Sequence, residues 1–156
     1  MKPEQNDTLY NERARVMEEK REALVLRLAG LLHESWREGR LDKVTGKYAP
    51  RLKVTRDKEW ISTHGGVEEL DIANTSFSDL PKDYQEENYL SARVAIEKIE
   101  DLLNLIHDNW LDRNDANATP EQKTQYSRLP DVEKLKDIDV LEEAVRVMRM
   151  NVTRPE

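Results

Sequence analysis

The sequence predicts a mainly α-helical protein, a helical bundle of about four to five helices joined by a long irregular connection that holds at most one short β element. Three observations predict this fold class. Apolar residues recur at spacings of three and four in three separate stretches, 37% of the 156 residues are charged, and only residues 41–56 show even a weak strand-like alternation. We therefore expect a single domain over residues 1–156, with a thin core drawn from helix faces.

The first helical stretch is predicted to begin near Asp7 or Thr8, because both side chains can cap a helix N-terminus. The charged residues in the middle of the stretch leave open whether one helix or two lead from there to residue 36. The second half carries apolar residues at spacings of four, three and four, namely Val25, Ala29, Leu32 and Trp36. We expect this stripe to be buried.

A connection of mixed character follows. Residues 41–56 are predicted to form either a loop or one short edge strand. Asp57 is a suitable N-cap for a short helix over 58–63, and residues 67–78 are predicted to be irregular, with Asn74 closing a turn through its side chain. Pro81 then marks the start of the next helix, since proline is favoured in a first helical turn.

The longest helical pattern covers residues 81–110. Its apolar seam alternates spacings of three and four and consists of Tyr89, Ala92, Ile96, Ile99, Leu103, Ile106 and Trp110. Such a seam can pair with the first helix in an intramolecular hairpin or with a second copy of the chain, and we favour the hairpin. Beyond it we expect a loop over 112–117, a short helix opened by Thr119 and Pro120, and a last amphipathic helix whose apolar residues lie between 138 and 148.

Two predicted helix ends have similar sequences. Leu31-Leu32-His33-Glu34-Ser35-Trp36 resembles Leu105-Ile106-His107-Asp108-Asn109-Trp110. Six positions are too few to establish a duplication, and the flanking residues differ. We interpret the likeness as a coincidence with a shared packing role at the ends of helices.

Charge is unevenly distributed along the chain. The formal net charge is -7, whereas the segment 37–58 holds eight basic and three acidic residues. Wrapping a nucleic-acid duplex requires basic charge over a broad face, so nucleic acid is not an expected partner. The basic segment can instead hold a phosphate or an acidic peptide, or it can neutralise the acidic remainder of its own fold.

The chain contains no cysteine and no long apolar run. The first feature excludes disulfides and thiolate catalysis, and the second argues against a membrane span or a signal peptide. We expect a cytoplasmic protein that does not bind membranes.

No motif indicates a particular reaction, so an enzyme is the less favoured interpretation and no cofactor is expected. Arg37 stands where a zinc-protease helix would place a second histidine after His33-Glu34. The order His33, then His107-Asp108, leaves open a metal-dependent phosphohydrolase of the HD type. A structural or assembly protein that dimerises through the 81–110 helix is a third alternative.

A resemblance to a known family favours a binding module. The residues that carry it are, in order, Leu28-Ala29, His33-Glu34-x-Trp36, Arg40-Leu41, Gly46-Lys47-Tyr48, Arg56-Asp57, Asp71, Phe77-Ser78-Asp79-Leu80-Pro81 and a polar helix containing Gln85-Glu86-Glu87-Asn88. In this order they resemble the ryanodine-receptor repeat, the RyR domain, a module of calcium-release channels and of stand-alone bacterial and phage proteins. The RyR-like module would cover residues 28–103, with an N-terminal helical extension over 1–27 and a C-terminal one over 111–156.

The resemblance implies a mostly helical, non-catalytic binding module without a metal site. Its ligand would be small and anionic, in particular nucleotide-derived, or a protein partner, and a homodimer is compatible with it. The residues expected to form the binding groove are His33, Glu34, Trp36, Tyr48, Arg51, Lys53 and Arg56. An aromatic platform beside cations suits a base joined to a phosphate. Trp36 is expected to serve mainly as a core anchor.

Overall fold

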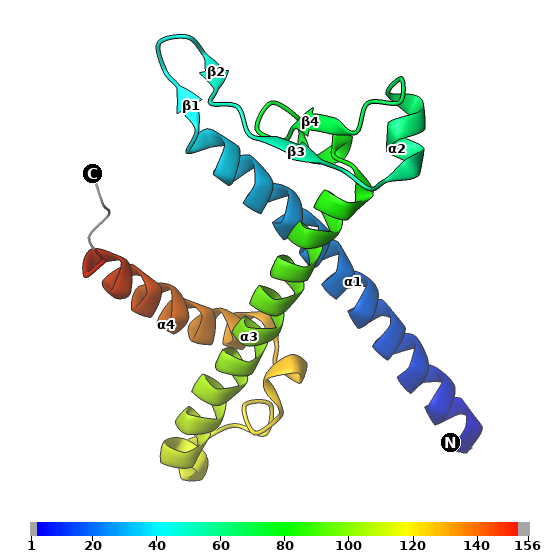
Figure 1. Ribbon diagram of the computed structural model, residues 1–156. Coiled ribbons are helices and arrows are strands. Elements are labelled where there is room, and N and C mark those ends of the chain that lie inside the picture. The colour runs from blue at the N-terminus through cyan, green and yellow to red at the C-terminus, as the bar shows by residue number, and fades with distance from the viewer. Residues whose placement is uncertain (1–2, 153–156) are drawn as a thin grey trace. The chain divides into compact units, whose positions relative to one another are not determined.

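The computed structural model describes the backbone of residues 3–152 and the side chains of residues 10–152 (Figure 1). The protein is 68% helical, with four α-helices in the described residues, which confirms the predicted mainly α-helical class with a short β element. The helices are α1 (Pro3–Glu38), α2 (Lys58–Thr63), α3 (Lys82–Asn114) and α4 (Asp131–Met150). The strands are β1 (Leu41–Asp42), β2 (Lys47–Tyr48), β3 (Leu52–Val54) and β4 (Glu69–Asp71), and short 3-10 turns cover Phe77–Asp79, Asp115–Asn117 and Tyr126–Arg128.

The chain divides into two compact units, Met1–Ile96 and Glu97–Glu156, and α3 contributes to both. The first unit holds α1, all four strands, α2 and the beginning of α3. The second holds the remainder of α3, two of the 3-10 turns and α4. Whether the two units form one domain, as the sequence predicts, stays a prediction.

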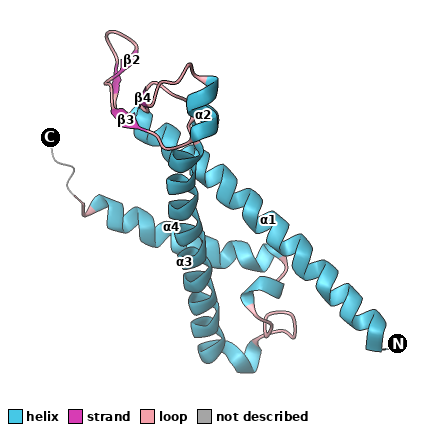
Figure 2. Cartoon of the chain, turned by 45° about the vertical axis from the view of Figure 1, so that its right-hand side comes forward, coloured by secondary structure: helices cyan, strands magenta, loops and turns pink. Residues whose placement is uncertain are grey.

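The core of the first unit lies where α1 meets the beginning of α3. Val25 and Ala29 of α1 and Ala92 of α3 are fully buried, and they are surrounded by Leu28, Phe77, Tyr89 and Ile96. Because alanine is small, it allows two helix backbones to approach closely. The two helices cross at this point (Figures 1 and 2). The α1 residues from 10 to 20 are all exposed, so the predicted pairing of the first helix with α3 does not extend to this part of α1.

The buried stripe of α1 differs from the predicted one. A single helix covers Pro3–Glu38, and its buried row consists of Val25, Ala29 and His33 at intervals of four. Leu32 and Trp36, which were expected in the stripe, are 38% and 39% exposed. The prediction was wrong there because it followed apolar residues alone. His33 takes the buried position because a hydrogen bond inside the fold satisfies its ring nitrogen.

The strands form two small antiparallel pairs in the connection between α1 and α3. Strand β1 pairs with β2 across a turn in which Gly46 has a φ of 67°, and β3 pairs with β4 with Lys53 opposite Leu70. The prediction of irregular structure over 67–78 was wrong at β4, because a three-residue strand is too short to show a periodic pattern. The side chain that closes the following turn is the Asp71 carboxylate, which accepts from Ala73 N, and not that of Asn74.

The second unit packs its buried residues between α3, the turn at Tyr126–Arg128 and α4. These residues are Leu103, His107, Leu129 and Asp137. The predicted loop over 112–117 is helical to Asn114 and then a 3-10 turn. The short helix predicted at Thr119 is a turn instead, because Thr119 and Gln122 satisfy each other's backbone N–H groups through their side chains and no periodic apolar face extends it.

In the part of the chain that the structure describes, none of the helices is long and apolar enough to cross a membrane.

Candidate functional site

The candidate site lies at the end of α1, around a buried histidine. His33 is 4% exposed, and its Nε2 lies 2.9 Å from the carbonyl oxygen of Thr75. A carbonyl oxygen can only accept, so Nε2 carries the proton and donates it. The imidazole also stacks on Trp36, with ring centroids 5.8 Å apart and planes inclined by 29°. The histidine thereby fixes both the loop after β4 and the Trp36 ring.

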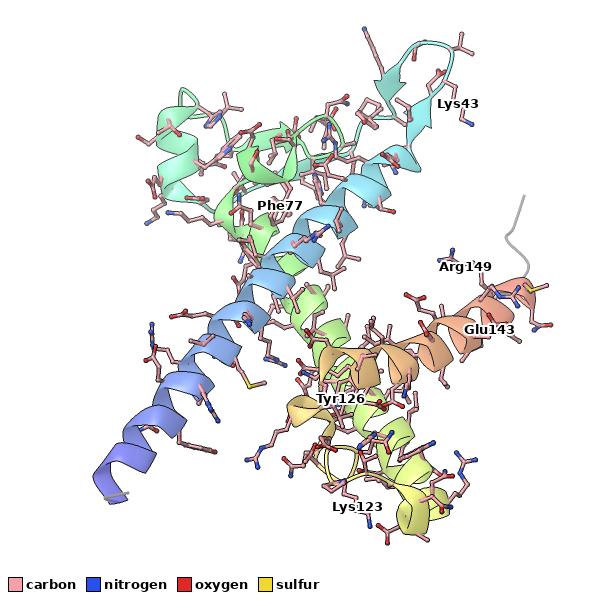
Figure 3. The ribbon with its side chains drawn as sticks, turned by 180° about the vertical axis from the view of Figure 1, so that it is seen from behind. Lys43, Phe77, Lys123, Tyr126, Glu143 and Arg149 are labelled. Atoms are coloured by element: carbon pink, nitrogen blue, oxygen red, sulfur yellow. The ribbon has the colours of Figure 1, made fainter. Side chains whose placement is uncertain are left out.

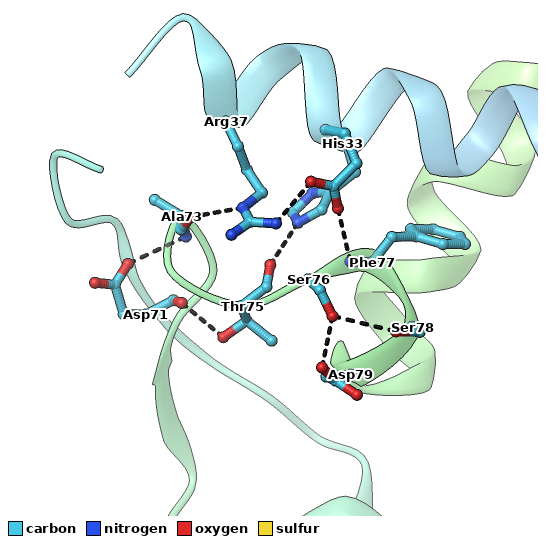
Figure 4. A network of polar contacts seen from close by, with 10 residues as sticks. His33, Arg37, Asp71, Ala73, Thr75, Ser76, Phe77, Ser78 and Asp79 are labelled. Carbon is cyan, nitrogen blue, oxygen red and sulfur yellow. Dashed lines mark hydrogen bonds and ion pairs between the residues drawn. The ribbon is translucent and has the colours of Figure 1, made fainter. Parts of the chain in front are cut away.

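Glu34 and Arg37 tie the same loop to α1 (Figure 4). The two oxygens of Glu34 accept from different donors, Oε1 from Phe77 N at 3.1 Å and Oε2 from the Arg37 guanidinium at 2.7 Å. Arg37 in turn donates from Nε to the carbonyl oxygen of Ala73 at 2.8 Å. Glu34 was predicted to bind ligand, but both of its oxygens already hold the loop 73–77 in place.

Asp71 holds the start of this loop against the chain before β3. Its Oδ1 accepts from Arg51 N at 2.9 Å and from Ala73 N at 3.1 Å, and its Oδ2 accepts from the Asn74 amide at 2.7 Å. Burial alone would raise the pKa of Asp71, but these hydrogen bonds stabilise the carboxylate and outweigh burial, so the pKa lies below its usual value. The loop that accepts the proton of His33 is therefore anchored at both ends.

Trp36 presents part of its ring to solvent. It is 39% exposed, and the guanidinium carbon of Arg40 lies 5.2 Å from the centroid of its ring. The carbonyl oxygens of Ala49 and Pro50 accept hydrogen bonds from Arg40 and fix its position. Trp36 is thus an aromatic surface beside a cation and not the fully buried core anchor that was expected.

A cavity of about 120 Å³ opens beside the histidine and the tryptophan. Its walls are formed by His33, Trp36, Ile72, Leu80, Tyr84, Glu87 and Asn88. The hydroxyl group of Tyr84 donates to Val54 O at 2.7 Å, and burial, together with the nearby Asp83 and Glu87, raises the pKa of Tyr84 above its usual value. The walls are thus mostly apolar or neutral, and Glu87 supplies their one carboxylate.

The remaining predicted residues do not line this cavity. The Tyr48 ring is covered by Arg37, whose guanidinium carbon lies 4.6 Å from the ring centroid. The side chains of Arg51, Lys53 and Arg56 form no ion pair with any described residue. Arg56 lies near Tyr84, since its charge acts to lower the pKa of that hydroxyl group. The structure therefore places His33 and Trp36 together in a cavity, and it places Glu34 and Tyr48 in the scaffold beside it.

The sequence analysis missed the wall that α3 contributes. Tyr84, Glu87 and Asn88 stand at positions i, i+3 and i+4 and therefore share one helix face. This spacing is visible in the sequence and could have identified the wall. Ile72 and Leu80 come from the loop and carry no comparable signal.

Among residues 3–152, no group of three or more histidine, aspartate or glutamate side chains is arranged to hold a metal ion. In comparisons with known proteins, no family model, no curated protein and no solved structure matches the chain. The resemblance to the RyR domain and the binding role that it implies stay predictions.

Proposed function

We propose that the first unit is a non-catalytic binding module, of the type that the RyR-like motif order suggests, and that it binds a small anionic ligand bearing an aromatic ring. The observation that carries the proposal is Trp36. It is 39% exposed, its ring stacks on that of His33, and it lies beside both a cavity and the Arg40 guanidinium. An exposed and rigidly held aromatic ring next to a cavity is a suitable platform for stacking.

The size and charge of the cavity determine how such a ligand would be oriented. A volume of about 120 Å³ is well below the roughly 300–1,000 Å³ of sites that enclose a whole drug-sized molecule, so only one end of the ligand would enter. Glu87 would repel an anionic group inside the cavity, but it can accept hydrogen bonds from ring N–H groups. The ring would therefore lie inside, and the anionic group would remain at the surface.

The basic segment beside the cavity supplies the charge that an anionic group needs. Seven of its eight cations form no ion pair with any described residue, namely Arg40, Lys43, Lys47, Arg51, Lys53, Arg56 and Lys58. Within this segment Arg37 does pair with a carboxylate, that of Glu34. This pattern supports an external anion more than neutralisation within the fold. A nucleotide, with its base in the cavity and its phosphate near the segment, combines both features.

The test is calorimetric titration of the full chain with AMP, ADP, ATP and cyclic mononucleotides. We expect saturable binding that Trp36→Ala and the double variant Arg51→Ala/Arg56→Ala weaken about tenfold or more, since each removes a stacking surface or two cations. Lys20→Ala, an exposed cation on α1 without a described partner, is the matched control and should bind normally. Circular dichroism would establish that the variants are folded.

The proposal fails if no nucleotide binds, or if Trp36→Ala and the double variant Arg51→Ala/Arg56→Ala both bind as the wild type does. Binding that is lost equally in Lys20→Ala would indicate attraction by overall charge and would also contradict it. An acidic peptide that binds in place of nucleotides would identify a protein partner as the occupant.

No observation favours the two alternative functions. His33 and His107 each donate from Nε2 to a backbone carbonyl within their own unit, and among the described residues neither belongs to a group of three or more side chains arranged to hold a metal ion. Dimerisation through residues 81–110 stays a prediction.

A further inference from the structure

The second unit repeats the local structure of the candidate site. His107 is 4% exposed, its Nε2 lies 3.0 Å from the carbonyl oxygen of Thr124, and its ring stacks on Trp110 with centroids 6.4 Å apart. His33, Thr75 and Trp36 are related in the same way in the first unit. The likeness of the two hexapeptides, interpreted above as a coincidence, is therefore accompanied by the same hydrogen bond and the same stacking.

The repetition continues beyond the threonine. Thr75-Ser76-Phe77-Ser78-Asp79-Leu80-Pro81 corresponds to Thr124-Gln125-Tyr126-Ser127-Arg128-Leu129-Pro130, with threonine, an aromatic residue, serine, leucine and proline at the same places. Phe77 and Tyr126, both labelled in Figure 3, each begin a 3-10 turn that leads through Leu-Pro into a helix. The histidine and the threonine are 42 residues apart in the first unit and 17 in the second, so the second lacks room for the strands and α2.

A second cavity, of about 200 Å³, occupies the equivalent place. It is lined by His107, Trp110, Gln122, Glu133, Lys136, Asp137 and Val140. Four of these residues lie on α4, the helix that follows the 3-10 turn. Three of the four, Glu133, Lys136 and Asp137, stand at the positions that correspond to Tyr84, Glu87 and Asn88. Two different stretches of chain thus form a cavity beside the same histidine, tryptophan and Leu-Pro helix start. This repetition argues that the cavity has a function and is not a packing defect.

The chemistry of the two walls differs. Glu133, Lys136 and Asp137 stand in place of Tyr84, Glu87 and Asn88. Glu133 is satisfied, because Oε1 accepts from Lys136 at 2.8 Å and Oε2 accepts from Gln122 at 3.1 Å. The ion pair with Lys136 offsets the charge of Glu133, so Asp137 is the other carboxylate of the wall.

Asp137 is a carboxylate whose hydrogen-bonding capacity is only partly used. It is 9% exposed, and its Oδ2 lies 3.4 Å from Nδ1 of His107. Its Oδ1 forms no hydrogen bond or ion pair with the described residues. Burial raises the pKa of Asp137, and His107 only partly offsets this effect. A buried carboxylate with a free oxygen in a cavity is stabilised by a cationic donor.

We propose that the second cavity binds a cationic group, an alkylammonium or a guanidinium, with Asp137 as the acceptor and Trp110 as the aromatic wall. A cation gains from both, since it pairs with a carboxylate and is attracted to the face of an indole ring. The site is separate from the nucleotide cavity proposed for the first unit, and it does not depend on that proposal.

The test is an NMR titration of the full chain with butylammonium chloride and ethylguanidinium chloride, followed at the indole N–H signals of the three tryptophans. The signal of Trp110, assigned with Trp110→Phe, should shift saturably, whereas those of Trp36 and Trp60 should not. Butanol, which has a similar chain and no charge, and sodium chloride at equal ionic strength should cause no saturable shift.

Two variants and one control identify the acceptor. Asp137→Asn installs the amide that the first unit has at Asn88, and it should weaken binding about tenfold or more. Lys136→Ala removes the nearby cation and should strengthen binding. Asp139→Asn removes an equal charge from an exposed position of the same helix and should leave binding unchanged.

The proposal is overturned if the wild type shows no saturable Trp110 shift, if butanol is as effective as the amine, or if Asp137→Asn binds normally. A Lys136→Ala variant that binds more weakly would contradict it as well, even if Asp137→Asn failed to fold. Nucleotide binding at Trp36 would be unaffected by any of these results.

Discussion

Replacing Glu34 by alanine is expected to destabilise the first unit by about 2–4 kcal/mol without changing the walls of its cavity. The change removes the acceptor of Phe77 N, and a part-buried N–H group left without a partner costs about 1–3 kcal/mol. It also removes the ion pair with Arg37, whose side chain is 12% exposed, at a further cost of about 1 kcal/mol. Urea unfolding at pH 7, followed by circular dichroism, measures the sum.

Two variants separate these contributions. Glu34→Gln keeps an oxygen for Phe77 but turns an amide N–H group toward Arg37, so it should fall between alanine and the wild type. Glu38→Ala removes the same charge from an exposed position of α1 and should change the free energy of unfolding by no more than about 0.5 kcal/mol. A Glu34→Ala protein as stable as the wild type would refute the structural role. If that stable variant had also lost nucleotide binding, Glu34 would be the ligand-binding residue that the sequence predicts.

Two further predictions concern the first unit, one at the starts of α2 and α3 and one at the β1–β2 turn. Asp57 accepts from Glu59 N and Trp60 N at the start of α2 and from Lys82 N at the start of α3, and the Lys82 hydrogen bond is the largest cause that holds the pKa of Asp57 below 3.8. The ionised Asp57 therefore stabilises the fold fully above the unfolded-state pKa, and this stabilisation is lost as the pH falls through the lower native pKa. In urea titrations, the difference in free energy of unfolding between wild type and Asp57→Asn should be present at pH 6 and should shrink toward pH 2. A difference that does not vary with pH would contradict this assignment. Gly46→Ala should weaken the β1–β2 hairpin by about 1 kcal/mol, because the φ of 67° is unfavourable for alanine although no atom obstructs its methyl group, and amide exchange of residues 41–48 should accelerate. Gly39→Ala, at a glycine without a positive φ, is the control.

The parts of the fold that sequence analysis predicted are those with a long periodic signal. The helix over 81–110 and the amphipathic helix near residue 140 have such signals, and α3 and α4 cover them. The cap at Asp57 was also found, because capping requires a particular side chain next to the helix start. The short strand β4 and the reciprocal turn at Thr119 have no periodic signal, since pairing with β3 in one case and two side-chain hydrogen bonds in the other determine their structure.

The candidate site shows a similar division. Of the residues predicted to bind ligand from their place at a helix end, His33 and Trp36 line the cavity, whereas Glu34 has its partners, Arg37 and Phe77 N, in the scaffold. A carboxylate looks the same in a sequence whether it faces a ligand or a backbone N–H group. Its role depends on a loop that lies 43 residues further along the chain, and local sequence carries no information about that contact.

The internal repeat was missed because its two halves are separated by different lengths of chain. The six-residue likeness at His33 and His107 was judged by its immediate neighbours, which differ because they lie on exposed helix surface. The second half, from threonine to Leu-Pro, begins 42 residues after one histidine and 17 after the other, so a search at a fixed period does not align it. The two copies share the residues that support the cavity, namely a histidine, a carbonyl oxygen to accept its proton, a tryptophan to stack on it and a Leu-Pro helix start. What they do not share is the wall of the cavity, with Tyr84, Glu87 and Asn88 in one and Glu133, Lys136 and Asp137 in the other. The two cavities thus have the same supporting residues and walls of different charge. This is the pattern expected if the two cavities bind different ligands.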